Sequence, residues 1–575
     1  MTLAAALASG GASHTATLRV TAGVAEGGFS RGSDTAGPLD DGIAVLERRM
    51  IGEAKGAIGG NQSETVRLLG TSRVRLIENS TGLGCSHGGF TTGAARAVIV
   101  PALTVAAAMR HGLCLMLFNS HLFLIGFLPL ALTLYAASGR LERGRVLVLL
   151  AVSIVFYGWW DLRFVPFLLG GIGLNWGAAR LFVATGRRAI ITAAIVLDLM
   201  LLGLFKYADF FAGTFAALTG TAAAPLGFAL PLGISFFTFH HIMYLADLRR
   251  GRAPLPSLDR YALYICFFPQ AIAGPLSRWQ EVGAQFGHAL AAPGWERRMA
   301  LAVAYIVLGL FEKIALGDPL GRLLDPVYAA SQSGPVADGA AWLAPLFLFQ
   351  VFFDFAGYSN IAIGLALLFG VVLPANFDRP FQAPSILAFW QRWHMTLGRF
   401  LRDYVFLRLA DWRIGRYRHT AAHYAAAIVA TMGLCGLWHG AGWHFVVWGL
   451  AQGLAMLVAL GWRRRMHGLP PGVGWALTIM FCLLSSVLFR AGSIEAAINI
   501  YASLGTLPTL GLLRESMLAG VVAVLAIAWP ASHTLCPRIL TWAGPAVPAV
   551  LGLIALVLMI QMGNADSYDF IYFQF

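Results

Sequence analysis

Long apolar runs separated by short polar breaks dominate the sequence from Met116 onward. A helix needs about 20 mainly apolar residues to cross the hydrocarbon core of a bilayer, so these runs predict membrane-spanning or near-spanning helices. We expect an all-α polytopic membrane protein with about 11–13 membrane helices, because some runs are too short to cross alone. The runs lie at residues 121–138, 145–160, 164–183, 188–206, 227–246, 298–316, 341–355, 358–374, 421–438, 443–461, 474–490, 516–530 and 546–562.

Two segments depart from the pattern of a plain spanning helix. Residues 261–275 are apolar but short, and they contain Pro269 and the pair Gly274-Pro275. A re-entrant hairpin is expected there, with its broken backbone covered by protein or by a water-filled cavity. Residues 385–409 place aromatic and leucine side chains at roughly helical spacing, with four arginines among them. This spacing predicts an interfacial amphipathic helix with its aromatic rings at headgroup depth.

The composition agrees with a membrane protein, because 58% of the residues are hydrophobic and only 12% are charged. The formal net charge is +13, but the basic residues form short clusters between apolar runs, as at 249–252 and 463–465. Such clusters are typical of cytoplasmic loops, so we expect the lipid bilayer and no nucleic acid as a partner. The six cysteines lack the close spacing of a zinc or redox motif, which predicts neither a disulfide framework nor a metal site.

Residues 1–115 differ in character from the rest of the chain. They contain no Trp and no Tyr and are rich in Gly, Ala, Ser and Thr, so they cannot supply much core. We interpret this segment as low-complexity and disordered, or as lying upstream of a true start at Met116, and residues 116–575 as one membrane domain. Abundant peptides from residues 1–100 in the native protein would contradict the start at Met116.

His439 is the main candidate for catalysis. It lies between Trp438 and Gly440 in an apolar segment, and His444 follows five residues later. Polar groups at membrane depth are costly and usually face a cavity, a partner or a reaction. We interpret His439 as a catalytic base, and the alternative is a buried histidine bonded to a backbone carbonyl. Gly440 and Gly442 have no side chains to block the close approach of a reacting group.

His394 and Asp354 are the other polar residues of interest. His394 directly follows Trp393 in the expected interfacial helix, and it lies 45 residues before His439. The two histidines could line a single polar tunnel. Asp354 interrupts an apolar run next to Gly357, and a central aspartate costs about 2.5–3.5 kcal/mol on insertion scales. It should therefore be paired or line a cavity, and a helix-to-helix hydrogen bond is the structural alternative.

Eight short stretches, taken in order, carry a family resemblance. They are Phe156-Tyr-Gly-Trp-Trp160, Pro231-Leu-Gly-Ile-Ser-Phe-Phe-Thr-Phe239, Phe268-Pro-Gln-Ala-Ile-Ala-Gly-Pro275, Phe353-Asp-Phe-Ala-Gly-Tyr-Ser359, Phe389-Trp-Gln-Arg-Trp-His394, Leu401-Arg-Asp-Tyr404, Gly436-Leu-Trp-His-Gly-Ala441 and Phe570-Ile-Tyr-Phe-Gln-Phe575. With these stretches, residues 116–575 resemble a membrane-bound O-acyltransferase (MBOAT) of the bacterial alginate O-acetyltransferase (AlgI-like) branch. Residues 1–115 have no counterpart in that family.

The resemblance implies roles for these residues. His439 would be the catalytic residue and His394 the second essential histidine, which could orient the acceptor or stabilise the tetrahedral oxyanion. Asp354, Tyr358, Trp393 and Trp438 would line or support the tunnel. Arginines at 385–409 and 413–418 are candidates for coenzyme A phosphates, with solvated loop charge as the alternative.

A pathway is implied as well. Related proteins take an acyl group from a thioester donor, here expected to be acetyl-CoA, and hold no bound cofactor. They pass it across the bacterial inner membrane to an extracytoplasmic acyltransferase partner that modifies a polysaccharide. The acceptor could be alginate, cellulose, peptidoglycan or another envelope glycan. Two further classes stay open at this point: a transporter or flippase with a histidine–aspartate proton relay, and a non-catalytic scaffold of an export complex.

Overall fold

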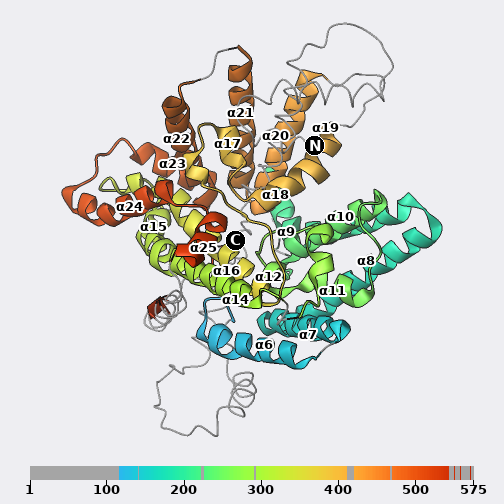
Figure 1. Cartoon of the computed structure of the whole chain (residues 1–575). Coiled ribbons are helices and arrows are strands. Elements are labelled where there is room, and N and C mark those ends of the chain that lie inside the picture. The colour runs from blue at the N-terminus through green and yellow to red at the C-terminus, as the bar shows by residue number, and fades with distance from the viewer. Residues whose placement is uncertain are drawn as a thin grey trace. The chain divides into compact units, whose positions relative to one another are not determined.

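The computed structural model describes residues 116–542 except 140, 222, 223, 225, 290–292, 411–419 and 466–468, together with 550, 554, 557, 558, 570 and 571. None of these residues forms a β-strand, so the all-α prediction is confirmed for the described part of the chain (Figure 1). In chain order the α-helices are α6 (Leu128–Ala137), α7 (Glu142–Trp160), α8 (Val165–Thr185), α9 (Arg188–Thr219), α10 (Ile234–Arg249), α11 (Leu258–Cys266), α12 (Phe268–Ala271), α13 (Trp279–Val282), α14 (Trp295–Phe311), α15 (Asp318–Ser331), α16 (Phe347–Leu368), α17 (Ile386–Trp390), α18 (Met395–Phe400), α19 (Leu407–Ala410), α20 (Ala421–His439), α21 (Trp443–Arg465), α22 (Pro471–Arg490), α23 (Ile494–Ser503), α24 (Leu510–Ala528) and α25 (Ser532–Trp542).

Eight helices within the described residues are long and apolar enough to cross a membrane. They are Glu142–Trp160, Leu162–Thr185, Arg188–Thr219, Trp295–Ser331, Ala340–Leu368, Ala421–His439, Trp443–Arg463 and Pro471–Arg490. A pair bent by 81°, Ala519–Ala528 and Ser532–Thr541, raises the number to nine if it counts as one span. The chain is therefore a multi-pass membrane protein.

Among the described residues the number of spans is lower than the 11–13 expected for the whole chain, partly for reasons of local geometry. The run at 227–246 becomes helical only at Ile234, and α10 is 16 residues long. The run at 121–138 forms a short apolar helix, Leu122–Ala137, which begins with a π-helical segment. The run at 546–562 and the N-terminal segment 1–115 lie mainly or wholly outside the described residues, so the prediction of a start at Met116 stays untested.

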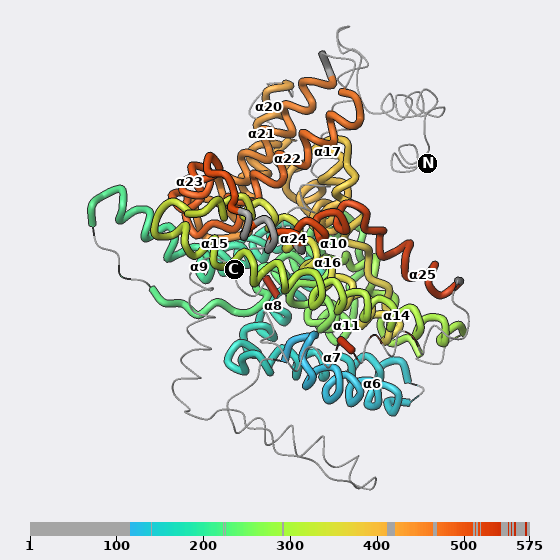
Figure 2. The backbone as a smooth tube through the Cα atoms, turned by 90° about the vertical axis from the view of Figure 1, so that its left-hand side faces the viewer, coloured from blue at the N-terminus to red at the C-terminus, as the bar shows by residue number. Residues whose placement is uncertain are grey.

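Helix α16 is the centre of the fold, because every residue from Phe347 to Leu368 is buried. It packs against α14 at very short range (Figures 1 and 2). A β-carbon at Gly364 would come within 2.6 Å of the carbonyl oxygen of Ala302, and one at Gly357 within 2.7 Å of that of Gly309. Small residues at these positions let the two backbones approach, which is how membrane helices gain contact in the absence of a hydrophobic driving force.

The segment 261–275 does not form a span. Helix α11 ends at Cys266, the chain turns at Phe267, and α12 is only four residues long. Protein groups satisfy the broken backbone: Gln270 Nε2 donates to Tyr264 O at 2.8 Å, and the Phe268 amide donates to Ser153 Oγ at 3.2 Å. The break is therefore covered by protein, as irregular backbone at membrane depth requires.

The segment 385–409 is not one continuous helix. It divides into α17, α18, a π-helical segment Leu401–Phe406 and α19, with a break at His394. Most of the aromatic and leucine side chains that suggested an interfacial face are buried in the protein: Phe389, Trp390, Trp393, Leu397, Phe400 and Leu401. Helical spacing could not reveal this break, because His394 adopts a left-handed backbone conformation, φ +42°, that tertiary hydrogen bonds hold in place.

Candidate active site

His439 is the last residue of α20, at the tip of a hairpin with α21. The two helices lie side by side, with α22 next to α21 (Figure 2). The side chain of His439 is completely buried. Its ring packs edge-to-face against Phe489, with centroids 4.7 Å apart, and against Trp448 at 5.2 Å. The rings hold the imidazole in one orientation, which a base requires.

Glycines allow the α20–α21 hairpin to close tightly. A β-carbon at Gly436 would overlap the carbonyl oxygen of Phe445, and one at Gly449 would overlap that of Met432. The expectation for Gly440 and Gly442 needs correction. The Phe445 ring fills the space beside Gly440, and the His444 ring lies beside Gly442, so these glycines make room for the chain's own side chains rather than for a substrate.

His394 is also completely buried, and it lies in the turn between α17 and α18. Its ring meets the Phe355 ring edge-to-face at 4.5 Å. Its Nδ1 lies 2.9 Å from the side-chain oxygen of Asn376, and the Asn376 amide nitrogen donates to Ser359 Oγ at 3.0 Å. A chain of hydrogen bonds thus joins His394 to α16.

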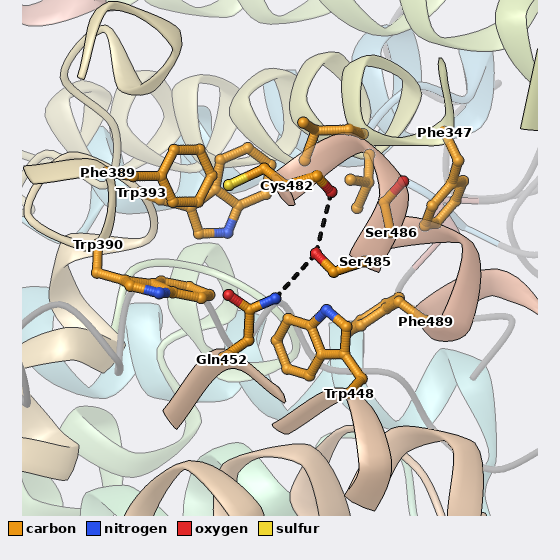
Figure 3. Close-up of a pocket in the computed structure, with 12 residues that line it drawn as sticks. Phe347, Phe389, Trp390, Trp393, Trp448, Gln452, Cys482, Ser485, Ser486 and Phe489 are labelled. Carbon is orange, nitrogen blue, oxygen red and sulfur yellow. Dashed lines mark hydrogen bonds between the residues drawn. The ribbon is translucent and has the colours of Figure 1, made fainter. Parts of the chain in front are cut away.

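A cavity of about 40 Å³ lies where the segments that carry the two histidines meet (Figure 3). Helix α17 contributes Phe389 and Trp390, and the turn after it contributes Trp393, which directly precedes His394. The opposite wall includes Trp448 and Phe489, the rings that contact His439. The remaining lining residues are Phe347, Leu348, Val351, Gln452, Cys482, Ser485 and Ser486. The cavity is mainly apolar, and neither histidine lines it, so it is not the single polar tunnel that the sequence suggested.

Trp438 does not line this cavity. Its indole stacks on Phe239, with centroids 5.3 Å apart and an interplanar angle of 24°. The backbone carbonyl of Trp438 accepts a hydrogen bond from Lys206 Nζ, and the ammonium lies 5.4 Å from the centre of the Trp438 ring. Trp438 therefore connects α9 and α10 to the helix end that carries His439.

Asp354 is held in a buried ion-pair network. Lys313 Nζ lies 2.5 Å from Asp354 Oδ1 and 2.8 Å from Asp318 Oδ1. The other oxygen of Asp354 accepts the Ile571 amide at 2.8 Å. The network thus anchors part of the C-terminal stretch singled out in the sequence, and both carboxylate oxygens of Asp354 are engaged in it.

Tyr358 is separate from the cavity beside His439. Its ring packs on Phe570 at 4.7 Å and on Phe118 at 5.1 Å. It lines a different cavity, of about 10 Å³, together with Met116, Leu117 and Phe118. The structure therefore brings Trp393 to the cavity of Figure 3, and it places Asp354, Tyr358 and Trp438 elsewhere.

Comparison with known proteins identifies the family. The sequence profile described as "MBOAT, membrane-bound O-acyltransferase family" matches residues 190–489, a range that contains both histidines. The chain belongs to the membrane-bound O-acyltransferase family. It is an O-acyltransferase by that membership, and the matches give no support to the transporter or scaffold alternatives.

Individual members of the family match most of the chain. The probable alginate O-acetylase AlgI of Pseudomonas aeruginosa is 35% identical over 72% of this chain and 80% of its own length. AlgI of Azotobacter vinelandii is 36% identical over 68% of this chain and 78% of its own. The peptidoglycan O-acetyltransferase of Helicobacter pylori is 32% identical over 67% of this chain and 79% of its own.

Two of the four described arginines that were candidates for phosphate binding are engaged in ion pairs. Arg399 pairs with Glu281, and Arg402 pairs with Asp403 at 2.8 Å. Arg278, outside the predicted set, also pairs with Asp403. Arg408 is exposed and the cluster at 413–418 lies outside the described residues. Arg399 and Arg402 thus have carboxylate partners, which favours a structural role for them.

Two polar residues of this site escaped the sequence analysis. Lys206 interrupts a long apolar run, and an intramembrane charge is by itself a signal of function, so the sequence offered a clue. Asn376 follows Pro374 in a loop with no periodic pattern. Nothing local in the sequence marks Asn376 as the partner of His394, because that contact exists only in the folded chain.

Proposed function

We propose that this acyltransferase transfers acetyl groups across the bacterial inner membrane for O-acetylation of an exported or cell-envelope polysaccharide. The names of its relatives support the proposal, since two are named probable alginate O-acetylase and one is named peptidoglycan O-acetyltransferase. The lipid bilayer surrounds the eight or nine spans of the described chain. An extracytoplasmic acyltransferase that receives the acetyl group is the proposed protein partner.

The size of the cavity in Figure 3 is the single observation that best supports acetyl as the transferred group. Its volume is about 40 Å³, and one water-sized group needs roughly 10–15 Å³ by this measure. The cavity therefore holds about three such groups, which matches the three heavy atoms of an acetyl group. Among the described residues, the buried indole N–H of Trp390 has no hydrogen-bond partner, and an acyl carbonyl oxygen in the cavity could accept from it.

Acetyl-CoA is the proposed donor, with no resident cofactor or metal. The hydroxyl oxygen attacks the thioester carbonyl carbon, His439 takes the hydroxyl proton, and the thiolate leaves as the tetrahedral intermediate collapses. A positioned base of this kind contributes typically about 10²–10⁴-fold. The acyl carbon must reach His439 past the edges of Trp448 and Phe489, because these rings separate the imidazole from the cavity.

The test is the ester content of exported polysaccharide and of peptidoglycan, measured chemically and by NMR. A deletion strain would be complemented with wild type, His439→Gln or His394→Gln, each checked for membrane expression. His423→Gln is the matched control, because His423 lies on the same helix as His439 and contacts the backbone carbonyl of Leu409.

We expect both active-site variants to lose the ester at normal polymer yield, while His423→Gln retains it. The polymer that loses its ester identifies the acceptor. Wild-type ester levels in the His439→Gln strain would refute the role of His439, and unchanged ester in the deletion strain itself would refute the function.

A further inference from the structure

The side chain of Asn376 is buried in a loop between α16 and α17, where its orientation can be assigned from its partners. The backbone amide of Thr396 lies 3.3 Å from Asn376 Oδ1, and the Thr396 hydroxyl lies 2.9 Å from it. A backbone N–H can only donate, so the atom that faces it must be the amide oxygen. The Thr396 hydroxyl already accepts the Leu276 amide at 3.1 Å, which leaves its hydrogen for Asn376.

This orientation decides where the proton of His394 lies. His394 Nδ1 is 2.9 Å from Asn376 Oδ1, an oxygen that can only accept. Nδ1 must therefore carry the hydrogen. A neutral imidazole has one N–H, so Nε2 carries the lone pair. The hydrogen bond made by Nδ1 therefore sets the state of Nε2, as is common for functional histidines.

The same loop also holds the backbone of His394. The Met395 amide donates to the Asn376 carbonyl oxygen at 2.8 Å, directly after the left-handed conformation of His394 at φ +42°. A residue other than glycine is strained in this conformation, and it keeps the conformation only where the surrounding structure holds it there. Asn376 thus fixes the position of His394 through its backbone and the protonation of His394 through its side chain.

We propose that Asn376 is a positioning residue that fixes His394 as the Nδ1–H tautomer, so that Nε2 accepts a hydrogen bond from the attacking hydroxyl. The inference rests on the proposed function and decides between the two roles that remained open for His394. A neutral His394 with its hydrogen on Nδ1 has no hydrogen on Nε2 to give to an oxyanion. It orients the acceptor hydroxyl instead, and His439 remains the base.

Charged residues lie near this arrangement along the chain or share a cavity with Asn376. Arg392 and Arg399 lie on the segment of His394, and Asp378 and Arg379 follow Asn376 in its loop. Glu312 lines, with Asn376 and Ser359, a small cavity of about 10 Å³. These groups are the same in wild type and in a variant of Asn376, so a difference between the two reports the residue at 376.

The direct test is solid-state ¹⁵N NMR of the full chain with ring-labelled histidine, at a pH where the ring is neutral. The signal of His394 is assigned as the one lost in His394→Gln. We expect Nδ1 to be the protonated nitrogen in wild type, and a mixture of tautomers or the Nε2–H form in Asn376→Leu. A wild-type His394 with its hydrogen on Nε2 would overturn the proposal, whatever the activity of the protein.

The second test is the pH dependence of acetyl transfer. Membrane vesicles that contain the full chain are given radiolabelled acetyl-CoA, and base-labile label is counted across pH. In Asn376→Asp the oxygen acceptor is kept, but a carboxylate favours the imidazolium. We expect the acid limb of the profile to move to higher pH by about one unit or more, with activity recovered at alkaline pH.

Asn499→Asp is the matched control, since Asn499 donates to the Ser331 carbonyl on another part of the structure. Its profile should coincide with that of wild type. If Asn376→Asp lowered the maximal activity without shifting the acid limb along the pH axis, Asn376 would have a merely structural role. That result would overturn the proposal. Wild-type vesicles that incorporate no label would instead count against the proposed function, while the NMR result would still decide the tautomer.

Discussion

Lys206 donates a hydrogen bond from the middle of α9 to the carbonyl oxygen of Trp438, the residue directly before His439. The lysine side chain is buried, and none of the described carboxylates lies within ion-pair distance of it. A cation at the C-terminal end of a helix interacts favourably with the helix dipole and with the last carbonyl groups. Lys206 therefore stabilises the helix end that carries the proposed base.

Replacing Lys206 with Met should reduce activity without unfolding the protein. The variant loses a charge-assisted hydrogen bond, which contributes about 1.5–3 kcal/mol, so His439 should be held less well. If the reaction depends fully on that bond, the rate falls about 10–150-fold. The free energy of unfolding should change less, because burial of an ammonium group without a carboxylate is itself costly. Ester formation and thermal unfolding in detergent measure the two effects.

Leu202→Met is the control for this substitution. Leu202 is buried on the same helix and makes no polar contact through its side chain. It should retain wild-type ester formation. Full activity of Lys206→Met would show that the bond to Trp438 has no part in placing His439.

The cavity of Figure 3 predicts how the donor chain length can be changed. Leu348 lines it from α16, and Leu348→Ala removes three carbon atoms from the wall. Butyryl has two carbons more than acetyl, so we expect the variant to transfer butyryl from butyryl-CoA better relative to acetyl than wild type does. The ratio of the two labels incorporated by membrane vesicles is the measurement.

Leu365→Ala provides a matched loss of volume. Leu365 is buried on the same helix, but it does not line the cavity. Both substitutions should destabilise the protein by a similar amount, about 2–5 kcal/mol. Only Leu348→Ala should shift the ratio of butyryl to acetyl. Equal shifts in the two variants would mean that the cavity does not receive the acyl group.

The sequence allowed the membrane helices to be located where apolar runs were long. The run at 421–438 corresponds to α20, Ala421–His439, and the run at 474–490 to α22, Pro471–Arg490. These predictions succeed because a bilayer forces the backbone to satisfy its own hydrogen bonds, which a long apolar segment can do only as a helix. His439 directly follows the run at 421–438, and it is the last residue of α20.

The break at His394 shows where this reasoning stops. Aromatic residues at helical spacing predicted one helix from 385 to 409, yet contacts with Asn376, 18 positions earlier, impose a turn. The partner of Lys206 lies 232 positions away and is a backbone carbonyl, which carries no signature in the side-chain sequence. The candidate catalytic histidines could therefore be identified from the sequence. The roles of Asn376 and Lys206 in positioning them could be identified only from the folded structure.

Lys313 should behave in the opposite way to Lys206. Its ammonium is buried between Asp354 and Asp318, so Lys313→Met would leave two carboxylates without their cation. Breaking a buried ion pair by removal of one partner typically costs about 3–5 kcal/mol. We expect a large drop in thermal stability and in membrane expression. Asp354→Asn should be milder, because the amide can still bond to its neighbours. Equal stability of Lys206→Met and Lys313→Met would contradict the assignment of Lys313 to a structural network.

Close packing at Gly436 links the stability of the α20–α21 hairpin to the position of His439, three residues later on the same helix. A methyl group at Gly436 would overlap the Phe445 carbonyl oxygen, and overpacking of this kind costs about 1–3 kcal/mol. Gly436→Ala should therefore lower both thermal stability and ester formation, since the helices must move apart. At Gly461 on α21, a β-carbon would meet no atom within 4 Å, so Gly461→Ala should be neutral or stabilising by about 0.5–1 kcal/mol through its helix preference. If Gly436→Ala matched Gly461→Ala in both measurements, the close approach of α20 and α21 would not be what holds His439 in place.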